Sequence, residues 1–452
     1  MNVNATMNVN AAARDPDPSD AAHLDYILVG ATVALLLLGA VMVYSASFVV
    51  AHNEFNDNAY FLVRQLLWIG AGLVALAIGY KVDYWRWRAV SLPIMLLCLV
   101  LLLLVLVPGI GSRSYGAVRW IKLGPLQLQP SEPAKIAIVL YLADWLSRRQ
   151  VLVRQFGKGL LPFAIIVGSL AWLVEMQPDL GTMSIIVGAA GCVFFVAGAN
   201  LLHVGVLGCG GVLAALTVVS HLSGYRQDRI TAFLDPWSDI QGSGWHTAQG
   251  LIALGSGGPF GVGLGDSHQK FYWVPNAHTD AIFAIIGEEL GFVGSVAVLG
   301  LFVVLAWRGF LIAWRAPDAF GRLFATGLTS MLALQALVNM AVVTNSVPYT
   351  GITLPLVSFG GSSTVISLLA IGLLLNIARH RYRRVEPDPP LDELEVGIER
   401  RPELAEPPRI FVPPSPRRRV AALPPPRSRR APPRAALGRS ARWARRYQDD
   451  DG

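Results

Sequence analysis

The sequence of 452 residues contains few charged residues and few cysteines. Charged residues make up 15 %, whereas soluble globular proteins carry about 25 %. Hydrophobic residues reach 53 %, and the mean hydropathy is +0.48. This balance excludes an ordinary soluble protein and predicts that most of the chain lies in a lipid bilayer. The cysteines Cys98, Cys192 and Cys209 lie in apolar runs without metal-ligand spacing, which argues against a disulfide framework or a zinc site.

The sequence also lacks a cleavable secretory signal and a nucleotide-binding loop. Residues 1–24 are polar, and no basic segment precedes a short apolar core and a cleavage site. No G-x-x-x-x-G-K-[ST] motif occurs, so ATP hydrolysis by a P-loop is unsupported. We expect residues 1–24 to form a disordered N-terminus in the cytoplasm.

The net charge of +7 belongs to an appended tail rather than to the hydrophobic body. From Arg379 to Gly452 there are 18 arginines and 11 acidic residues, whereas the preceding part holds 19 basic and 19 acidic residues. We therefore expect no nucleic-acid partner. Residues 385–452 are rich in proline and arginine, which predicts a disordered cytoplasmic tail. This tail is either a solvated topology anchor or a contact for anionic lipid and acidic partners.

Apolar runs divide the body into segments near the ~20 residues that a bilayer requires. Ten spans are predicted, at about 25–48, 61–80, 88–107, 132–147, 159–176, 181–198, 202–220, 280–306, 321–344 and 364–379. The basic loops at 81–90, 148–158 and 307–322 fall on the same face as the start of the tail, and the positive-inside rule makes that face cytoplasmic. We expect an all-α polytopic membrane protein of about ten transmembrane helices with both termini in the cytoplasm.

Two of the predicted extracytoplasmic loops are unusual. The loop at 221–279, between the seventh and eighth spans, is the longest, and long loops usually carry function. Within it, Arg226–Phe233 is expected to lie on the membrane surface and Ala248–Leu254 to re-enter the membrane. The loop at 108–131 is basic, so it is either solvated or a site for an anionic group. Its basic residues are Arg113, Arg119 and Lys122.

Ionisable residues in or beside the spans are costly in lipid, so each is a functional candidate. Glu132 and Lys135 are three positions apart on one helix face, as a structural ion pair or as part of a site. Asp179 precedes the sixth span, where it could instead cap the helix. Asp280 begins the eighth span at the outer surface, either as a helix cap or as a chemical group, and His278 is close by.

Glycine is dense at Gly255–Gly265, which runs on to Lys270, and at Phe359–Ser363 before the last span. Glycine permits close backbone approach and exposes N–H donors. Ser362 and Ser363 at the start of a helix add caps and anion contacts.

Together these segments resemble the SEDS family (shape, elongation, division and sporulation proteins), which includes FtsW, RodA and SpoVE. The matching stretches, in family order, are Gln129–Lys135, Glu175–Thr182, Tyr225–Pro236, Gln249–Gly265, His278–Gly291 and Leu354–Ser363. The resemblance identifies residues 25–384 as a SEDS-like transmembrane catalytic domain. Ser267–Lys270 and Leu140–Ala143 are more similar to the FtsW branch than to RodA, whereas Asn276, Ala281 and His246 depart from the usual family residues.

The resemblance implies a peptidoglycan glycosyltransferase that polymerises lipid II on the outer face of the bacterial cytoplasmic membrane, during cell division or elongation. Asp280 matches the family's essential aspartate, and it would act as the base or hold a divalent cation, Mg²⁺ or Mn²⁺. The cations expected at the pyrophosphate are Arg113, Arg119, Lys122, Lys135 and Lys270. The supporting polar residues are Glu132, Lys135, His278, Asp179, Ser362 and Ser363.

The implied partners are lipid II, a class B penicillin-binding protein that cross-links the glycan, and other divisome or elongasome membrane proteins. Two other functions remain open from the residues alone. A lipid II flippase should place ionisable groups near the midplane of the membrane, whereas the candidates here lie at the outer edge. A non-catalytic division scaffold would tolerate substitution of Asp280.

Overall fold

The computed structural model describes residues 24–114, 117–123, 126–149, 152–220 and 225–380. The chain divides into a compact unit, Met1–Glu386, and a second unit, Pro387–Gly452. The second unit lies outside the described residues. The predicted tails at 1–24 and 385–452 therefore fall outside the described residues as well, apart from residue 24.

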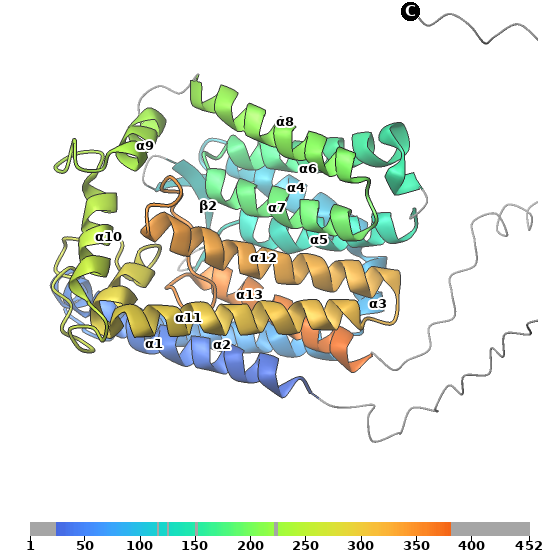
Figure 1. The fold of residues 1–452 in the computed structure, drawn as a ribbon. Helices are drawn as coiled ribbons and strands as arrows, with labels where there is room; N and C mark the ends of the chain where they lie inside the picture. Colours follow the sequence, from blue (N-terminus) through green and yellow to red (C-terminus); the bar gives the residue numbers. More distant parts are fainter. Residues whose placement is uncertain (1–23, 115–116, 124–125, 150–151, 221–224, 381–452) are drawn as a thin grey trace, which may run out of the picture. The chain divides into compact units, whose positions relative to one another are not determined.

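Each of the ten predicted spans is a helix (Figure 1). These helices are α1 (Tyr26–Phe55), α2 (Tyr60–Lys81), α4 (Ser91–Val105), α5 (Ser131–Ser147), α6 (Leu161–Glu175), α7 (Leu180–Val196), α8 (Leu201–Ser220), α11 (Ile282–Trp314), α12 (Ala319–Val343) and α13 (Gly361–Arg379). Among the described residues, 6 helical segments are long and apolar enough to cross a membrane. The protein is therefore an integral membrane protein, while the count of ten spans stays a prediction.

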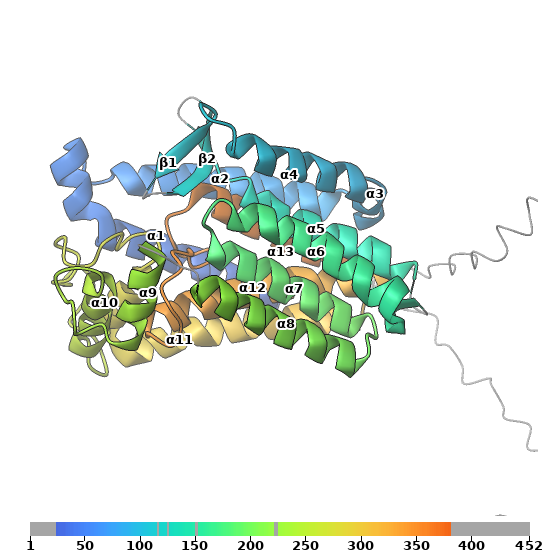
Figure 2. The same ribbon diagram turned by 90° about the horizontal axis from the view of Figure 1, so that it is seen from above.

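The long helices run side by side, and small residues bring some of them close together (Figures 1 and 2). At Gly372 of α13, an added Cβ would lie only 2.3 Å from the carbonyl oxygen of Leu76 in α2. Close backbone approach at small residues is a main source of helix association in lipid, where apolar burial gives little driving force. Helix α1 is tied to α11 by Asp25, which caps α1 and accepts hydrogen bonds from Arg308 at 2.6–3.1 Å.

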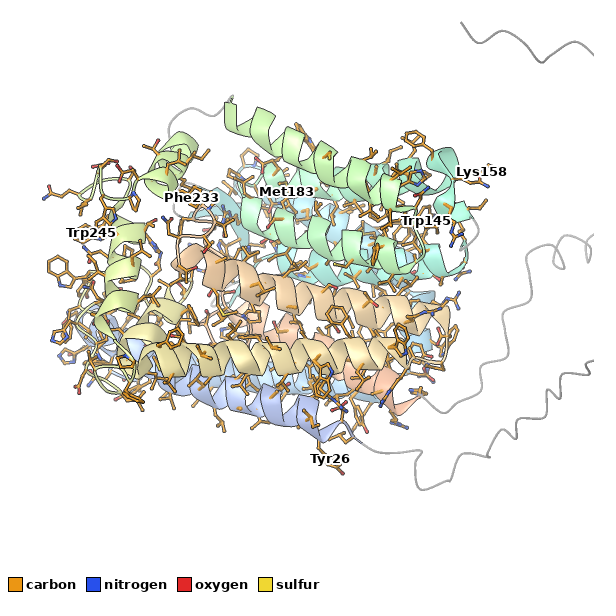
Figure 3. All side chains as sticks on the ribbon, viewed as in Figure 1. Tyr26, Trp145, Lys158, Met183, Phe233 and Trp245 are labelled. Atoms are coloured by element: carbon orange, nitrogen blue, oxygen red, sulfur yellow. The ribbon has the colours of Figure 1, made fainter. Side chains whose placement is uncertain are left out.

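The helix connections separate into two ends of the bundle. Figure 3 places Trp245 and Phe233 at one end and Trp145 and Lys158 at the other. The short helix α3 (Tyr84–Ala89) lies at the Lys158 end, and the segments predicted to be extracytoplasmic gather at the Trp245 end (Figure 1). We call the Trp245 end the loop end.

The segment at 108–131 corrects the all-α expectation, because it forms a three-stranded antiparallel sheet at the loop end. Its strands, in sheet order, are β1 (Gly111–Ser114), β2 (Ala117–Leu123) and β3 (Leu126–Leu128). The basic residues Arg119 and Lys122 of β2 are three positions apart, and Ile121 is buried while Lys122 is exposed. The sequence of β2 therefore does not show the strict period of two by which a half-buried strand is recognised.

The long loop contains the two helical pieces that the sequence predicts. Helix α9 (Tyr225–Leu234) covers the amphipathic stretch, and α10 (Trp245–Ser256) covers Ala248–Leu254. Their predicted depth in the membrane stays a prediction. After α10 the glycine-rich segment folds back onto α11, and Val262 N–H donates to the Glu288 carbonyl at 3.0 Å. A Cβ at Gly261, whose φ is +83°, would lie 2.1 Å from the Glu289 carbonyl oxygen, so only glycine fits there.

Two buried glutamates of α11 hold this glycine-rich loop in place. Glu288 accepts hydrogen bonds from the Ser267 hydroxyl and from the His268 N–H at 2.8 Å. Glu289 accepts from the Ser45 hydroxyl at 2.6 Å and lies 3.2 Å from the Lys270 ammonium. Because all the ionised oxygens have donors, both carboxylates can remain buried in the membrane body.

We predict that Lys270→Met destabilises the protein by about 3–5 kcal/mol, because it leaves the Glu289 carboxylate buried without its counter-ion. The double variant Lys270→Met/Glu289→Met should recover much of this loss, since it removes both charges. Denaturant unfolding of the detergent-solubilised protein measures both values. Lys158→Met, at an exposed lysine of the opposite end, is the control. Equal stability of Lys270→Met and this control would contradict the prediction.

Candidate active site

The described residues enclose a cavity of about 1460 Å³ at the loop end. Its walls come from α1, α2, β2, the starts of α5 and α7, α9, α10 and the segments at 270–280 and 349–363. Of the residues predicted from the sequence, it brings together Arg119, Glu132, Asp179, Lys270, His278, Asp280 and Ser363. Segments that are far apart in the chain therefore converge on one site.

Asp280 does not cap α11, which rules out the structural alternative for this residue. The helix begins at Ile282, and the capping position is held by Ala281 without a side-chain hydrogen bond. The Asp280 backbone is fixed instead by Asn339 of α12, whose amide donates to the Asp280 carbonyl at 2.8 Å and to the Ile352 carbonyl at 2.7 Å. The Asp280 carboxylate is thus left for the cavity, although the residue is only 8 % exposed.

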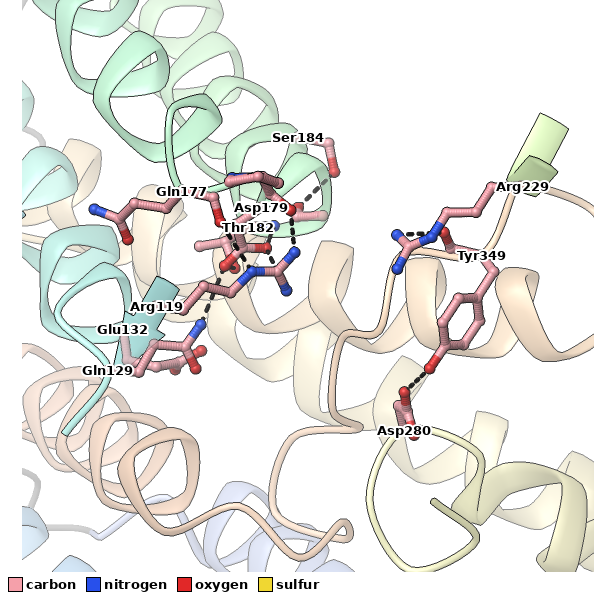
Figure 4. A network of polar contacts seen from close by, with 12 residues as sticks. Arg119, Gln129, Glu132, Gln177, Asp179, Thr182, Ser184, Arg229, Asp280 and Tyr349 are labelled. Carbon is pink, nitrogen blue, oxygen red and sulfur yellow. Dashed lines mark hydrogen bonds and ion pairs between the residues drawn. The ribbon is translucent and has the colours of Figure 1, made fainter. Parts of the chain in front are cut away.

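Hydroxyl groups orient the Asp280 carboxylate. The Tyr349 hydroxyl donates to Oδ2, and the Thr279 hydroxyl donates to Oδ1 at 3.0 Å. Arg229 stacks over the Tyr349 ring at 5.2 Å and donates to the Tyr349 carbonyl at 3.2 Å (Figure 4). Tyr349 therefore connects an arginine of α9 to the carboxylate.

Two histidines lie near Asp280 and are uncharged at neutral pH. The His246 ring lies 4.1 Å from the Tyr349 ring, and the His278 ring lies 4.4 Å from the Phe61 ring of α2. Burial lowers the pKa of His246, and it lowers the pKa of His278 to about 4, while the nearby Asp280 opposes both shifts. Neither imidazole therefore brings a positive charge to the Asp280 carboxylate in the resting site.

A second polar group surrounds Glu132 and confirms that Glu132 and Lys135 form an ion pair on one helix face. The Lys135 ammonium lies 2.9 Å from Glu132 and donates to Gln335 of α12 at 2.6 Å. Gln335 in turn donates to the Ser363 hydroxyl at 3.1 Å. Glu132 and Ser363 line the cavity, but Lys135 is 2 % exposed and its charge is directed at Glu132.

Asp179 fulfils the capping alternative and also belongs to a network with Arg119. It caps α7 by accepting from the Thr182 N–H at 3.1 Å, and Gln129 donates to its carboxylate at 3.1 Å. The Arg119 guanidinium lies 3.8 Å from Asp179 and donates to the Gln177 carbonyl at 3.1 Å. Figure 4 shows this network and the Asp280 group as two separate sets of polar contacts.

Three predicted site residues lie outside the cavity wall or are bonded to other parts of the protein, and a fourth, Arg113, is not described beyond its backbone. Lys122 is exposed on β2 and is not among the cavity-lining residues. Arg113 lies on β1, and its side chain is outside the described atoms. Ser362 does not cap α13 but donates to a backbone carbonyl of β3 at 3.3 Å. Lys270 lines the cavity, yet its ammonium is neutralised by Glu289, a pairing that the spacing of 19 residues could not reveal.

Several site residues were missed from the sequence, notably Tyr349 and Arg229. Their roles depend on contacts with residues far away in the chain, so no local pattern marks them. Gln335 and Asn339 did carry a signal, because they are polar side chains four positions apart in an apolar span. Such a pair shares one helix face and must point into protein. Among the described residues, no group of 3 or more His, Cys, Asp or Glu side chains is arranged to hold a metal ion.

Comparison with known proteins gives consistent matches. The family model FtsW/RodA/SpoVE, described as "Cell cycle protein", matches residues 26–383. The chain is 46 % identical over 359 residues to stage V sporulation protein E of Bacillus subtilis, covering 79 % of this chain and 98 % of that protein. It is 44 % identical over 363 residues to the probable peptidoglycan glycosyltransferase FtsW of Trichlorobacter lovleyi, covering 80 % and 94 %.

Solved structures share the fold. A structure described as "Structural coordination of polymerization and crosslinking by a peptidoglycan synthase complex" aligns with a TM-score of 0.64 at 32 % identity, covering 80 % of this chain and 99 % of that one. The rod shape determining protein RodA of Thermus thermophilus aligns with a TM-score of 0.60 at 32 % identity, covering 80 % and 98 %. The family match and these relatives show that the chain belongs to the FtsW/RodA/SpoVE family.

Proposed function

We propose that this protein is a peptidoglycan glycosyltransferase that polymerises lipid II into glycan strands. The observation that carries the proposal is the Asp280 carboxylate, oriented by Tyr349 and Thr279 inside a large cavity at one end of a membrane bundle. The relatives support the same activity, since FtsW of Trichlorobacter lovleyi is named a probable peptidoglycan glycosyltransferase.

The chemistry requires a base at the acceptor sugar. An acceptor hydroxyl attacks the anomeric carbon of the donor, so that a glycosidic C–O bond forms and the C–O bond to the lipid pyrophosphate breaks. Asp280 takes the proton of the attacking hydroxyl, and the pyrophosphate leaves with the bonding electron pair. Burial lowers the pKa of His278 to about 4, so His278 is a weaker base than an ordinary histidine. The lipid tail of the substrate explains why the catalyst is embedded in the membrane.

A divalent cation, Mg²⁺ or Mn²⁺, fits the donor set at Asp280. Such ions are commonly held by one or two carboxylates together with the phosphates of a substrate, rather than by a complete protein cage. Asp280 supplies a carboxylate in the cavity, and the pyrophosphate would supply the other oxygens. When bound, the cation would offset the negative charge of the leaving pyrophosphate.

We propose that the active site faces the extracytoplasmic side of the bacterial cytoplasmic membrane. The cavity lies at the loop end, whereas the basic connections that the positive-inside rule assigns to the cytoplasm belong to the opposite end. The same one-sided position argues against a lipid II flippase, whose site should lie near the midplane.

The proposed partners are a class B penicillin-binding protein and other divisome or elongasome membrane proteins. The support is the fold shared with a solved structure whose description couples polymerization to crosslinking in a peptidoglycan synthase complex.

We predict that Asp280→Asn lowers the rate of polymerisation at least about 100-fold, because an amide of nearly the same shape cannot accept the proton. The assay is electrophoresis of the products formed from fluorescent lipid II by the purified protein with its partner and a divalent metal. Asp266→Asn, an exposed aspartate of the same connection, should keep full activity. Normal glycan synthesis by folded Asp280→Asn protein would refute the proposed function.

We predict that Tyr349→Phe reduces turnover by about 10- to 150-fold, the range expected for the loss of one hydrogen bond to a charged group. The phenylalanine ring keeps the packing against His246 and Arg229, so the thermal stability should change little. The lipid II assay reports the rate, and Tyr26→Phe, 72 % exposed on α1, is the control. Wild-type turnover of Tyr349→Phe would show that the hydroxyl does not orient Asp280.

A further inference from the structure

The cavity must receive a negatively charged substrate, so the state of each cation in its wall is informative. The described cavity-lining cations are Arg64, Arg119, Arg229 and Lys270. Lys270 is paired with Glu289, and Arg119 is engaged by two backbone carbonyls and by Asp179. Arg229 is bonded to the Tyr349 carbonyl and packed on the Tyr349 ring. These three cations are held by the protein itself.

Arg64 differs from the other three. Its guanidinium stacks over the Tyr60 ring at 4.3 Å, and it forms neither a hydrogen bond nor an ion pair with any described residue. The side chain is exposed, so its charge is accessible from the cavity. An arginine within an apolar span normally faces a partner or a water-filled cavity, because its charge is costly in lipid.

The position of Arg64 on α2 places it between the cavity and the bilayer. Phe61, Arg64 and Trp68 follow one another at helical spacing, and all three line the cavity. The Phe61 ring packs against His278, which brings this face of α2 to the segment that carries Asp280. Leu66, on the opposite face of α2, is 51 % exposed and is therefore directed at lipid.

Arg64 lies near the first turn of α2. Helical side chains lean toward the helix N-terminus, and the stacking on Tyr60, the first residue of α2, shows this direction here. The guanidinium is thus directed to the loop end of the span, where lipid headgroups are expected. Its planar fork binds phosphate oxygens in pairs and is more weakly hydrated than an ammonium.

We propose that Arg64 binds the diphosphate of the polyprenyl-linked substrate as that lipid passes from the bilayer around α2 into the cavity. Arg64 is then a substrate-binding residue rather than the base. The identity of the substrate rests on the proposed function. The choice of Arg64 rests on the observation that the other three described cations of the cavity wall are bonded to the protein itself. Binding of ordinary phospholipid headgroups alone is the competing outcome.

The test compares Arg64→Gln and Arg64→Lys with the wild type, using the full-length protein with its partner in phosphatidylcholine vesicles. We expect the KM for fluorescent lipid II to rise about tenfold or more in Arg64→Gln, with kcat nearly unchanged, because one charge-assisted phosphate contact is lost. Arg64→Lys keeps the charge but not the fork, so its KM should be intermediate. Arg86→Gln, an exposed arginine of α3 at the end of the bundle opposite the cavity, is the matched control.

A second measurement does not require catalysis. Direct binding of a fluorescent undecaprenyl diphosphate to the same variants should weaken in parallel with the rise in KM. Unlabelled undecaprenyl diphosphate should compete for this binding, whereas inorganic pyrophosphate and undecaprenol should compete poorly. This pattern identifies a lipid-borne diphosphate as the ligand and excludes free pyrophosphate.

Equal KM and equal binding of undecaprenyl diphosphate for Arg64→Gln and Arg86→Gln would overturn the proposal. The proposal would also be overturned if phosphatidylglycerol vesicles abolished the binding of undecaprenyl diphosphate equally in the wild type and in Arg64→Gln. Failure of the proposed function gives a different result. In that case the wild type forms no polymer from lipid II, while the loss of diphosphate binding in Arg64→Gln remains measurable.

Discussion

The site depends on the burial of two adjacent carboxylates, Glu288 and Glu289, in the first part of α11. A buried carboxylate is very unfavourable unless donors surround it, and here the donors come from the segment that precedes the helix. The glycine-rich loop must therefore fold back onto α11 and form backbone hydrogen bonds with it. Because α11 begins just after Asp280, the hydrogen bonds between this loop and the helix fix both the start of α11 and the position of Asp280.

The lipid environment explains where the irregular backbone occurs. In a bilayer every backbone donor and acceptor must be satisfied inside the protein, so non-helical segments are confined to places where protein or water surrounds them. The loop end contains such segments, including the short sheet and the two connections that carry Tyr349 and Asp280. Positive φ values at Tyr272, Asn276 and Leu356 also occur in these connections. Asparagine tolerates this conformation, whereas Leu356 adopts it at a cost that its buried surroundings must offset.

Much of this fold could be predicted because lipid imposes a simple pattern. A run of apolar residues long enough to span the bilayer identifies a helix without knowledge of its neighbours, and the ten predicted spans are all helices. The short β-sheet could not be predicted in the same way, because the basic residues of β2, Arg119 and Lys122, are three positions apart and do not show the period of two of a half-buried strand. Charge is rare in lipid because it is costly there, so the few charged residues in or beside the spans stood out in the sequence. Asp280, Glu132 and Asp179 were identified in this way.

The spacing of residues indicated the Glu132–Lys135 ion pair, but it could not show that Glu289 neutralises Lys270. Lys135 and Lys270 have the residue type expected for a pyrophosphate site, but each lies within reach of a buried acid in the folded chain. Tyr349 is separated from Asp280 by 69 positions, and its role follows only from the folding of the loop that Asn339 holds. Recognition of a motif therefore located the acid, whereas the assignment of its partners required three-dimensional contacts.

The balance of positive and negative side chains in the cavity connects the two parts of the proposed mechanism, which are binding of the lipid diphosphate and departure of the pyrophosphate. Two of its acids, Glu132 and Asp179, are matched by protein cations, and the Asp280 carboxylate receives hydroxyl donors. A diphosphate that enters this cavity therefore meets little free positive charge from the protein. Arg64, at the bilayer side, would then bind the diphosphate of the incoming lipid. A divalent cation at Asp280 would offset the negative charge of the leaving pyrophosphate.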